Sequence, residues 1–169
     1  MTDILRWKDL TPEDQSLLLR AQDVARNAYA PYSGFTVGAA VRAKDGRIYI
    51  GANLENASYG LGICAEVSAI TAANSDGNFH LDAIAVFGRG MSPSTSIGPV
   101  TTPCGRCRQL IHEASDVSGC DILVISANSD LSEIHVAKIS QLLPDAFGPA
   151  NLSQVTNTSR KSNRSSAGE

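Results

Sequence analysis

The sequence is short of positive charge and of aromatic side chains. Fourteen Lys and Arg residues face seventeen Asp and Glu residues, which gives a formal net charge of −3, and aromatic residues make up 5%. A protein that binds nucleic acid along its backbone needs a basic surface with rings on which bases stack. We therefore expect no nucleic-acid partner, although Arg160, Lys161 and Arg164 give the C-terminus a weak local positive charge.

Long hydrophobic runs are missing from the N-terminal segment "MTDILRWKDLTPEDQ". This segment does not have the apolar stretch of a signal peptide or a membrane span, so we expect a cytoplasmic protein with no membrane partner. Cysteine is also scarce, with four residues in the chain. In a reducing compartment these cysteines are thiols or metal ligands rather than a disulfide framework.

Length and composition predict one domain of ordinary size. Of the 169 residues, 43% are hydrophobic, which is enough for a buried core. We place this domain at residues 1–150. Residues 151–169 are rich in Ser and Asn and poor in large apolar side chains, which predicts a polar, disordered tail.

Helical and strand patterns alternate along the domain. Thr11 and Pro12 predict a helix start, and Asp45-Gly46 predicts the turn of a β-hairpin. The other expected elements are a buried helix over 64–74, a buried strand over 81–88, a helix over 105–115, strands within 121–126 and 133–137, and a helix ending near 143. This order predicts an α/β fold, with one mixed sheet and helices on its faces.

Three cysteines fall at the expected starts of two helices. Cys64 begins one of them, and Cys104 and Cys107 begin another at C-x-x-C spacing. Helix N-termini favour thiolates, and residues three apart share one helical face. Three thiolates with a fourth position open are typical of a catalytic zinc site, but the spacing alone also fits a structural zinc half-site or a redox pair. Cys120 stands alone at the start of a strand, and we interpret it as a core residue.

Glu66, two residues after Cys64, gives such a metal a catalytic use. Zinc lowers the pKa of a bound water from about 15.7 to about 7, and a neighbouring carboxylate can take the proton and pass it on. Three thiolates leave the metal centre with a net negative charge, which opposes this effect. The two helix N-termini offset part of it, and Arg108 can offset more by donating to a ligand sulfur.

The pattern "CAE…PCGRCRQ" resembles that of the zinc nucleoside and base deaminases, for which it is a known signature. Within this group the chain is similar to cytidine deaminases of the small homotetrameric type. The similar segments are "APYSGFTVGAA", "DGRIYIGANLENASYGLGICAE", "PCGRCRQ" and "LLPDAFGPANL", which together run from about residue 29 to 152.

The resemblance implies a fold, a metal and a reaction. The fold is a three-layer α/β/α sandwich with a mixed five-stranded sheet, and Cys64, Cys104 and Cys107 hold one Zn²⁺. Glu66 moves protons from the water to N3 of cytosine and then to ammonia. The reaction is hydrolytic deamination of cytidine and 2′-deoxycytidine, a step of pyrimidine salvage.

The resemblance also implies a set of substrate contacts. Asn53 and Glu55 bind the ribose 3′-hydroxyl, an amide and a carboxylate both being suited to this. Phe35 packs on the pyrimidine, and Ala65 also contacts the substrate. Tyr59, with Tyr32, lies near a subunit interface at the site. Phe147 reaches the active site of a neighbouring subunit, so that a homotetramer shares its active sites.

Two residues depart from the common pattern of this family. Val67 stands where many members have an arginine that helps to neutralise the thiolates, and Arg106 stands where a small residue is common. An arginine at the second position also occurs in blasticidin S deaminase, whose substrate carries a carboxylate, so an aminohydrolase of that kind is the alternative. A zinc-stabilised binding module is a further alternative, but a structural site has no need of Glu66.

Overall fold

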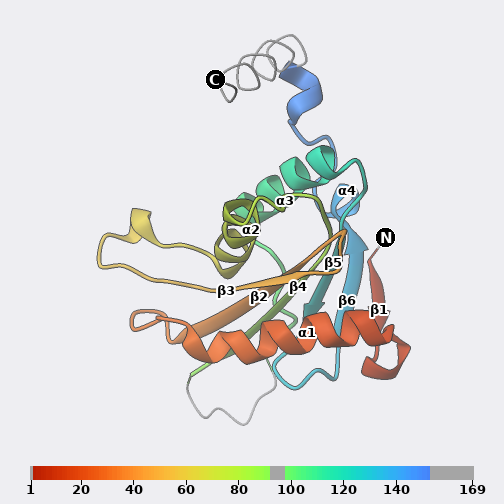
Figure 1. The fold of residues 1–169 in the computed structure, drawn as a ribbon. Coiled ribbons are helices and arrows are strands. Elements are labelled where there is room, and N and C mark those ends of the chain that lie inside the picture. Colours follow the sequence, from red (N-terminus) through yellow and green to blue (C-terminus); the bar gives the residue numbers. More distant parts are fainter. Residues whose placement is uncertain (1, 92–97, 153–169) are drawn as a thin grey trace.

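The computed structural model describes residues 2–91 and 98–152. One six-stranded sheet, in the order β1-β6-β5-β4-β2-β3, carries helices on both faces (Figure 1). Only β4 and β5 pair in parallel among these neighbours. The strands are β1 Asp3–Leu5, β2 Phe35–Ala43, β3 Ile48–Ala52, β4 Leu81–Gly90, β5 Leu123–Ala127 and β6 Ile134–Lys138. The predicted α/β sandwich with a mixed sheet is confirmed, but the predicted number of five strands was wrong.

The sixth strand is β1, which pairs antiparallel with β6 at the edge of the sheet. It has three residues, with Asp3 opposite Val136 and Leu5 opposite Ile134. Three residues are too few for an alternating pattern to stand out in the sequence. Its strand conformation follows from the free backbone groups of β6, which pair with whatever extended segment lies beside them.

Helix α1, Pro12–Val24, covers one face of the sheet. As predicted, Thr11 caps it, with Oγ1 accepting from the backbone N–H of Asp14 at 3.2 Å. Leu17 and Leu18 are fully buried against small residues of the sheet such as Ala40. A short 3₁₀ turn, η2 Ala25–Asn27, follows the helix.

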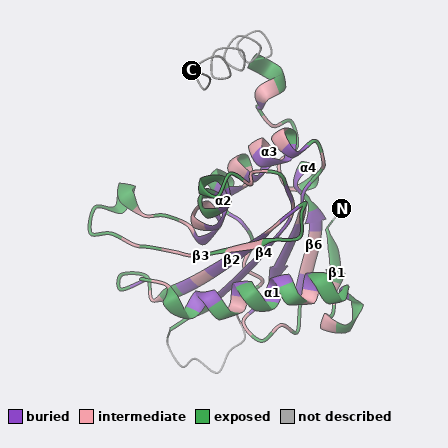
Figure 2. Cartoon of the chain, viewed as in Figure 1, coloured by how far each residue is buried: buried purple, intermediate pink, exposed green. Residues whose placement is uncertain are grey.

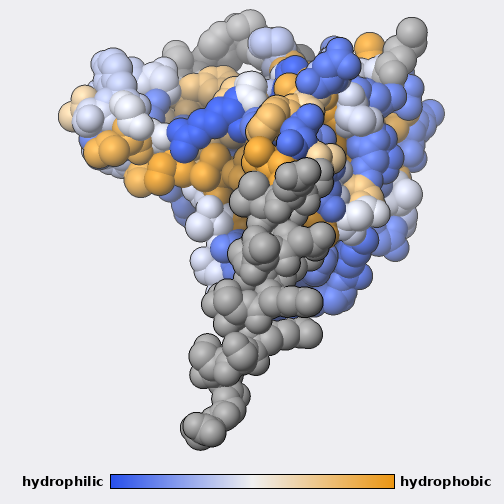
Figure 3. Space-filling view, turned by 90° about the horizontal axis from the view of Figure 1, so that it is seen from above, coloured by the Kyte–Doolittle hydropathy of each residue, from blue (hydrophilic) through white to orange (hydrophobic). Residues whose placement is uncertain are grey.

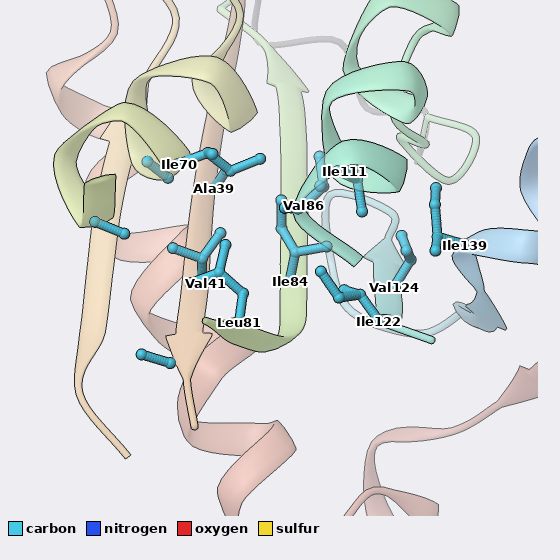
Figure 4. Packing of buried hydrophobic residues seen from close by; sticks show 14 of the residues in the cluster. Ala39, Val41, Ile70, Leu81, Ile84, Val86, Ile111, Ile122, Val124 and Ile139 are labelled. Carbon is cyan, nitrogen blue, oxygen red and sulfur yellow. The ribbon is translucent and has the colours of Figure 1, made fainter. Parts of the chain in front are cut away.

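The opposite face carries α2, Ala65–Ser75, and α3, Gly105–Ser118, with the short α4, Ile139–Leu142, beside α3. Branched aliphatic side chains fill the space between these helices and the sheet, and Figure 4 shows them pointing toward one another. We expected α2 to be buried as a whole. In the single chain it buries one face only, and Thr71 and Ala72 are exposed (Figure 2).

Small residues set how closely α2 approaches the sheet. A Cβ at Gly51 of β3 would lie 2.4 Å from the backbone nitrogen of Ala69 and 2.6 Å from the carbonyl oxygen of Ala65. Helix α2 therefore packs directly on the backbone of β3. This contact fixes the N-terminal turn of α2, where the candidate site residues Cys64 and Glu66 lie.

Two segments extend from the body of the domain. The loop after β3 projects beyond the sheet edge and contains the 3₁₀ turn η3, Tyr59–Leu61 (Figure 1). The final 3₁₀ turn, η4 Pro149–Leu152, lies beyond α3, and a first one, η1 Trp7–Asp9, precedes α1. Most of the predicted tail, from residue 153 on, lies outside the described residues. Within the described parts of the chain, every helix is too short or too polar to cross a membrane.

Candidate active site

The starts of α2 and α3 bring three cysteines together. Cys64 is the N-cap residue of α2 and Cys104 that of α3, and Cys107 lies in the first turn of α3. The Sγ atoms of Cys64 and Cys104 are 3.9 Å apart, and those of Cys104 and Cys107 are 3.6 Å apart. All three sulfurs lie within 4.8 Å of one another and could hold a metal ion. Both N-cap thiols are free of a capping hydrogen bond.

The sulfur cluster fits zinc. Zn–S bonds of about 2.3 Å in a tetrahedron place neighbouring sulfurs roughly 3.8 Å apart, which agrees with the two measured separations. Tetrahedral sets rich in thiolate are typical zinc sites. Three protein ligands leave the fourth position for water or substrate, as a catalytic site requires.

The thiols influence one another. Hydrogen bonding with the Cys107 thiol lowers the pKa of Cys64 to about 6. The same interaction, together with burial, raises the pKa of Cys107. Three neighbouring thiols cannot all ionise without a compensating cation, because each thiolate charge disfavours ionisation of the next thiol. The donor set is therefore suited to a divalent metal.

Glu66 lies in the first turn of α2, and its side chain is buried in the same region. Burial raises the pKa of Glu66, and the nearby Cys64 sulfur raises it further. A carboxyl group with a raised pKa can both accept a proton and give it up near neutral pH, as a general acid–base catalyst must.

A cavity of about 440 Å³ opens above the cysteines. Seven of the residues predicted from the sequence line it, namely Phe35, Asn53, Glu55, Cys64, Ala65, Glu66 and Cys104. Thr101 and Thr102 also line the cavity, and we did not predict them. Their position directly before Pro103-Cys104 was the available signal, because residues next to a metal ligand share its surroundings.

Asn53 holds the start of β2, where Phe35 lies. Its Oδ1 accepts from the backbone N–H of Val37 at 2.8 Å, and its Nδ2 donates to the carbonyl oxygen of Phe35 at 3.1 Å. The phenyl ring of Phe35 remains partly exposed at the cavity. Asn53 therefore orients the segment that carries the Phe35 ring, in addition to any contact that Asn53 makes with a ligand.

Glu55 connects the main cavity with an adjoining one. Its Oε2 accepts from the backbone N–H groups of Tyr32 at 2.8 Å and Ser33 at 3.2 Å. Hydrogen bonds from the Ser33 side chain and the Tyr32 backbone lower the pKa of Glu55, so the carboxylate is ionised at neutral pH. Tyr59 lines the adjoining cavity of about 360 Å³ and meets Tyr32 edge to face, with ring centroids 6.0 Å apart.

The two arginines of the "PCGRCRQ" motif have different partners. Arg108 donates from Nε to the carbonyl oxygen of Pro103 at 2.9 Å and from Nη1 to that of Leu142 at 3.1 Å. It therefore ties the ligand segment to the end of α4. Arg106 donates from Nη1 to the carbonyl oxygen of Gly62 at 3.5 Å, and its charge contributes to the lowered pKa of Cys64.

Phe147 lies away from the cavity of its own chain. Its side chain is exposed, and its carbonyl oxygen accepts from Nε2 of Gln109 on α3 at 2.7 Å. Figure 3, which views the molecule from above, shows hydrophobic residues exposed on that face. The role predicted for Phe147 in a neighbouring subunit stays a prediction.

These features define a zinc-binding deaminase site on an α/β sandwich. Residues 11–120 match the family model described as "Cytidine and deoxycytidylate deaminase zinc-binding region". The cytidine deaminase of Sporosarcina psychrophila is 40% identical over 139 residues, which cover 82% of this chain and 94% of that protein. The cytidine deaminase of Mycobacterium tuberculosis H37Rv is 41% identical over 132 residues, with coverages of 78% and 87%.

Solved structures give the same result. The cytidine deaminase from Burkholderia pseudomallei superposes with a TM-score of 0.66 at 36% identity, over 82% of this chain and all of that one. The enzyme from M. tuberculosis gives a TM-score of 0.63 at 37% identity, over 82% and 99% of the two chains. The chain therefore belongs to the cytidine and deoxycytidylate deaminase family, whose members bind zinc.

Proposed function

We propose that this protein hydrolyses cytidine and 2′-deoxycytidine to uridine and 2′-deoxyuridine, with release of ammonia. The observation that carries the proposal is the shared cavity, in which two cysteines of the thiol cluster, the buried Glu66 and the ring of Phe35 face one space. Family membership and the named activity of the relatives support the same reaction.

The three cysteines would hold the zinc ion, which as a Lewis acid supplies a nucleophilic water at neutral pH. Glu66 would accept one proton of the attacking water and give it to N3 of the cytosine. It would then take the second proton from the hydroxyl added at C4 and deliver it to the amino group, which leaves as ammonia while the C4 carbonyl forms. Burial of Glu66 supports this role, because its raised pKa lets the carboxyl group bind and release protons in turn.

The other lining residues bind and orient the nucleoside. Phe35 packs on the pyrimidine ring, and the ionised Glu55 accepts a hydrogen bond from the ribose 3′-hydroxyl, with Asn53 beside it. Ala65 is the first residue of α2, so its backbone N–H has no partner within the helix and can donate to the base. Arg108 fixes the segment that holds two of the ligands.

We further propose that the active protein is a homotetramer with active sites shared between chains. Phe147 and Tyr59 are large, exposed aromatic residues. Such residues are typical of interfaces, where they bury a large area. In this arrangement Phe147 enters the site of a neighbour, and Tyr59 lies at the interface near the substrate. The reaction belongs to pyrimidine salvage, and a reducing cytoplasm suits the four free cysteines.

One screen tests the reaction. Ammonia release is measured with cytidine, deoxycytidine, deoxycytidylate, cytosine, blasticidin S and adenosine. We expect turnover of the two nucleosides and little of the free base, which lacks the ribose that Glu55 binds. A preference for blasticidin S would favour the alternative aminohydrolase, for which Arg106 beside the cavity-lining Gly62 offers a carboxylate partner. Absence of turnover on all of them would contradict the proposal.

A further inference from the structure

The backbone of Phe147 is attached to the outer face of α3. Gln109 donates from Nε2 to the carbonyl oxygen of Phe147 at 2.7 Å, the shortest class of hydrogen bond for an amide donor. The side chain of Phe147 is exposed at the same time. The backbone of this residue is therefore held, while its ring remains available to another molecule.

The residue after Phe147 also packs on α3. Gly148 is buried, and a Cβ there would lie 2.6 Å from Nε2 of His112 and 2.8 Å from Oδ2 of Asp116. The backbone of this segment thus packs directly against the helix. Further back along the chain, Arg108 donates to the carbonyl oxygen of Leu142.

Between α4 and η4 the chain has no helix or strand, so side-chain contacts determine its path. Gln109 and His112, three residues apart on α3, contact Phe147 and Gly148 in this segment, and Arg108 holds the preceding end of α4. The first turn of the same helix carries Cys104 and Cys107. Helix α3 therefore fixes the position of Phe147 relative to the thiol cluster of its own chain.

We propose that Gln109 is a positioning residue that presents Phe147 to the active site of a neighbouring chain. This inference rests on the proposed function, in which Phe147 stacks on the substrate of that neighbour. A segment that is already ordered does not have to lose conformational freedom when the nucleoside binds, so binding is tighter. Without the Gln109 hydrogen bond, this ordering opposes binding, and the cost appears in KM.

The test is a double-mutant cycle on the full-length assembled enzyme. Gln109→Ala, Phe147→Ala and the double variant are compared with wild type for kcat, KM, zinc content and oligomeric state. We expect Gln109→Ala to raise the KM for cytidine about 3- to 10-fold, the range for loss of one hydrogen bond. The kcat, zinc content and assembly should not change. The double variant should have the KM of Phe147→Ala, because Gln109 acts through that ring.

Two further variants make the test specific. Gln22→Ala makes the same change on α1, on the opposite face of the sheet, and should leave KM unchanged. Gln109→Met keeps the length of the side chain without a donor N–H, so it should raise KM as Gln109→Ala does, even if the alanine variant folds poorly.

The outcomes separate this inference from the proposed function. A Phe147→Ala enzyme with the wild-type KM would refute the shared site itself. If Phe147→Ala raises KM but Gln109→Met does not, the shared site stands and the positioning role is wrong. KM effects of Gln109 and Phe147 that multiply in the double variant would also overturn the positioning role, because the two residues would then act independently.

Discussion

The metal end of the active site, formed by the three cysteines and Glu66, differs in its burial from the proposed aromatic wall, formed by Phe35, Tyr59 and the Phe147 of a neighbouring chain. Cys107 and Glu66 are 0% and 4% exposed, and each is fixed in the first turn of a helix. Phe35, Tyr59 and Phe147 are 40%, 80% and 59% exposed. The groups that perform the chemistry are therefore positioned by one chain. The aromatic residues that would bind the substrate are exposed and available for contact with a neighbouring chain.

This difference has a physical reason. A thiolate cluster and a proton shuttle need fixed geometry and helix N-termini, both of which one folded chain supplies. An aromatic ring that stacks on the base only has to reach the face of that base, and a neighbouring chain can supply such a ring. Changes at the metal end should therefore affect metal content and turnover, and changes at the wall should affect substrate binding.

Removal of a metal ligand should have the largest effect. We expect Cys104→Ala and Cys107→Ala to lose zinc, activity and thermal stability together, because metal binding is coupled to folding. Cys120→Ala, which removes a cysteine outside the cluster, should keep zinc and activity and serves as the control. A small loss of thermal stability is expected there, because Cys120 packs against the core and its Sγ donates to the carbonyl oxygen of Leu81. Metal analysis after dialysis and a thermal melt provide the measurement. One full equivalent of tightly bound zinc in either ligand variant would refute the three-cysteine assignment.

Glu66→Gln should separate turnover from metal binding. We expect kcat to fall by about 10²–10⁴-fold, because the proton shuttle is lost while the shape of the side chain is kept. Zinc content should be unchanged. The thermal midpoint should not fall, since burial raises the pKa of Glu66 and a neutral amide avoids the buried charge. Glu13→Gln on α1 is the control, and a Glu66→Gln enzyme with more than roughly a tenth of wild-type turnover would exclude the shuttle role.

A smaller effect is expected at the wall, for Glu55→Gln. The amide oxygen can still accept from the backbone of Tyr32 and Ser33, so the loop should keep its shape. Loss of the charge weakens the hydrogen bond to the ribose hydroxyl, which we expect to raise the KM for cytidine by roughly tenfold. Steady-state kinetics measure this directly. A change in kcat without a change in KM would mean that Glu55 acts in turnover, as the metal end does, and would contradict its assignment to substrate binding.

The sequence predicted the metal end better than the wall. Cys64, Glu66, Cys104 and Cys107 stand in short motifs at helix starts, so their meeting in space follows from local structure plus one packing of two helices. The turn at Asp45-Gly46 and the Thr11 cap were likewise local signals, and the structure confirms both.

Features that depend on distant parts of the chain were missed. Strand β1 exists only because β6 offers a free edge. Thr101 and Thr102 line the cavity, where the backbone N–H of Thr101 donates to the carbonyl oxygen of Ala127 at the end of β5. We considered a ligand sulfur as the partner of Arg108, but its guanidinium donates to the carbonyl oxygens of Pro103 and Leu142 instead. The packing of α4 beside α3 sets that contact, and no local pattern shows it.

The central claim is that one chain forms the metal centre and a neighbouring chain supplies Phe147 to the same active site. Mixed oligomers test this claim most directly. Chains with Glu66→Gln cannot move protons but still carry Phe147, and chains with Phe147→Ala carry Glu66 but lack the ring. When the two are coexpressed and assembled together, a Phe147→Ala chain should receive Phe147 from its neighbour. The account predicts a kinetic component with wild-type KM in the mixed oligomer, absent from both parents. Kinetics equal to the sum of the two parental enzymes would contradict it.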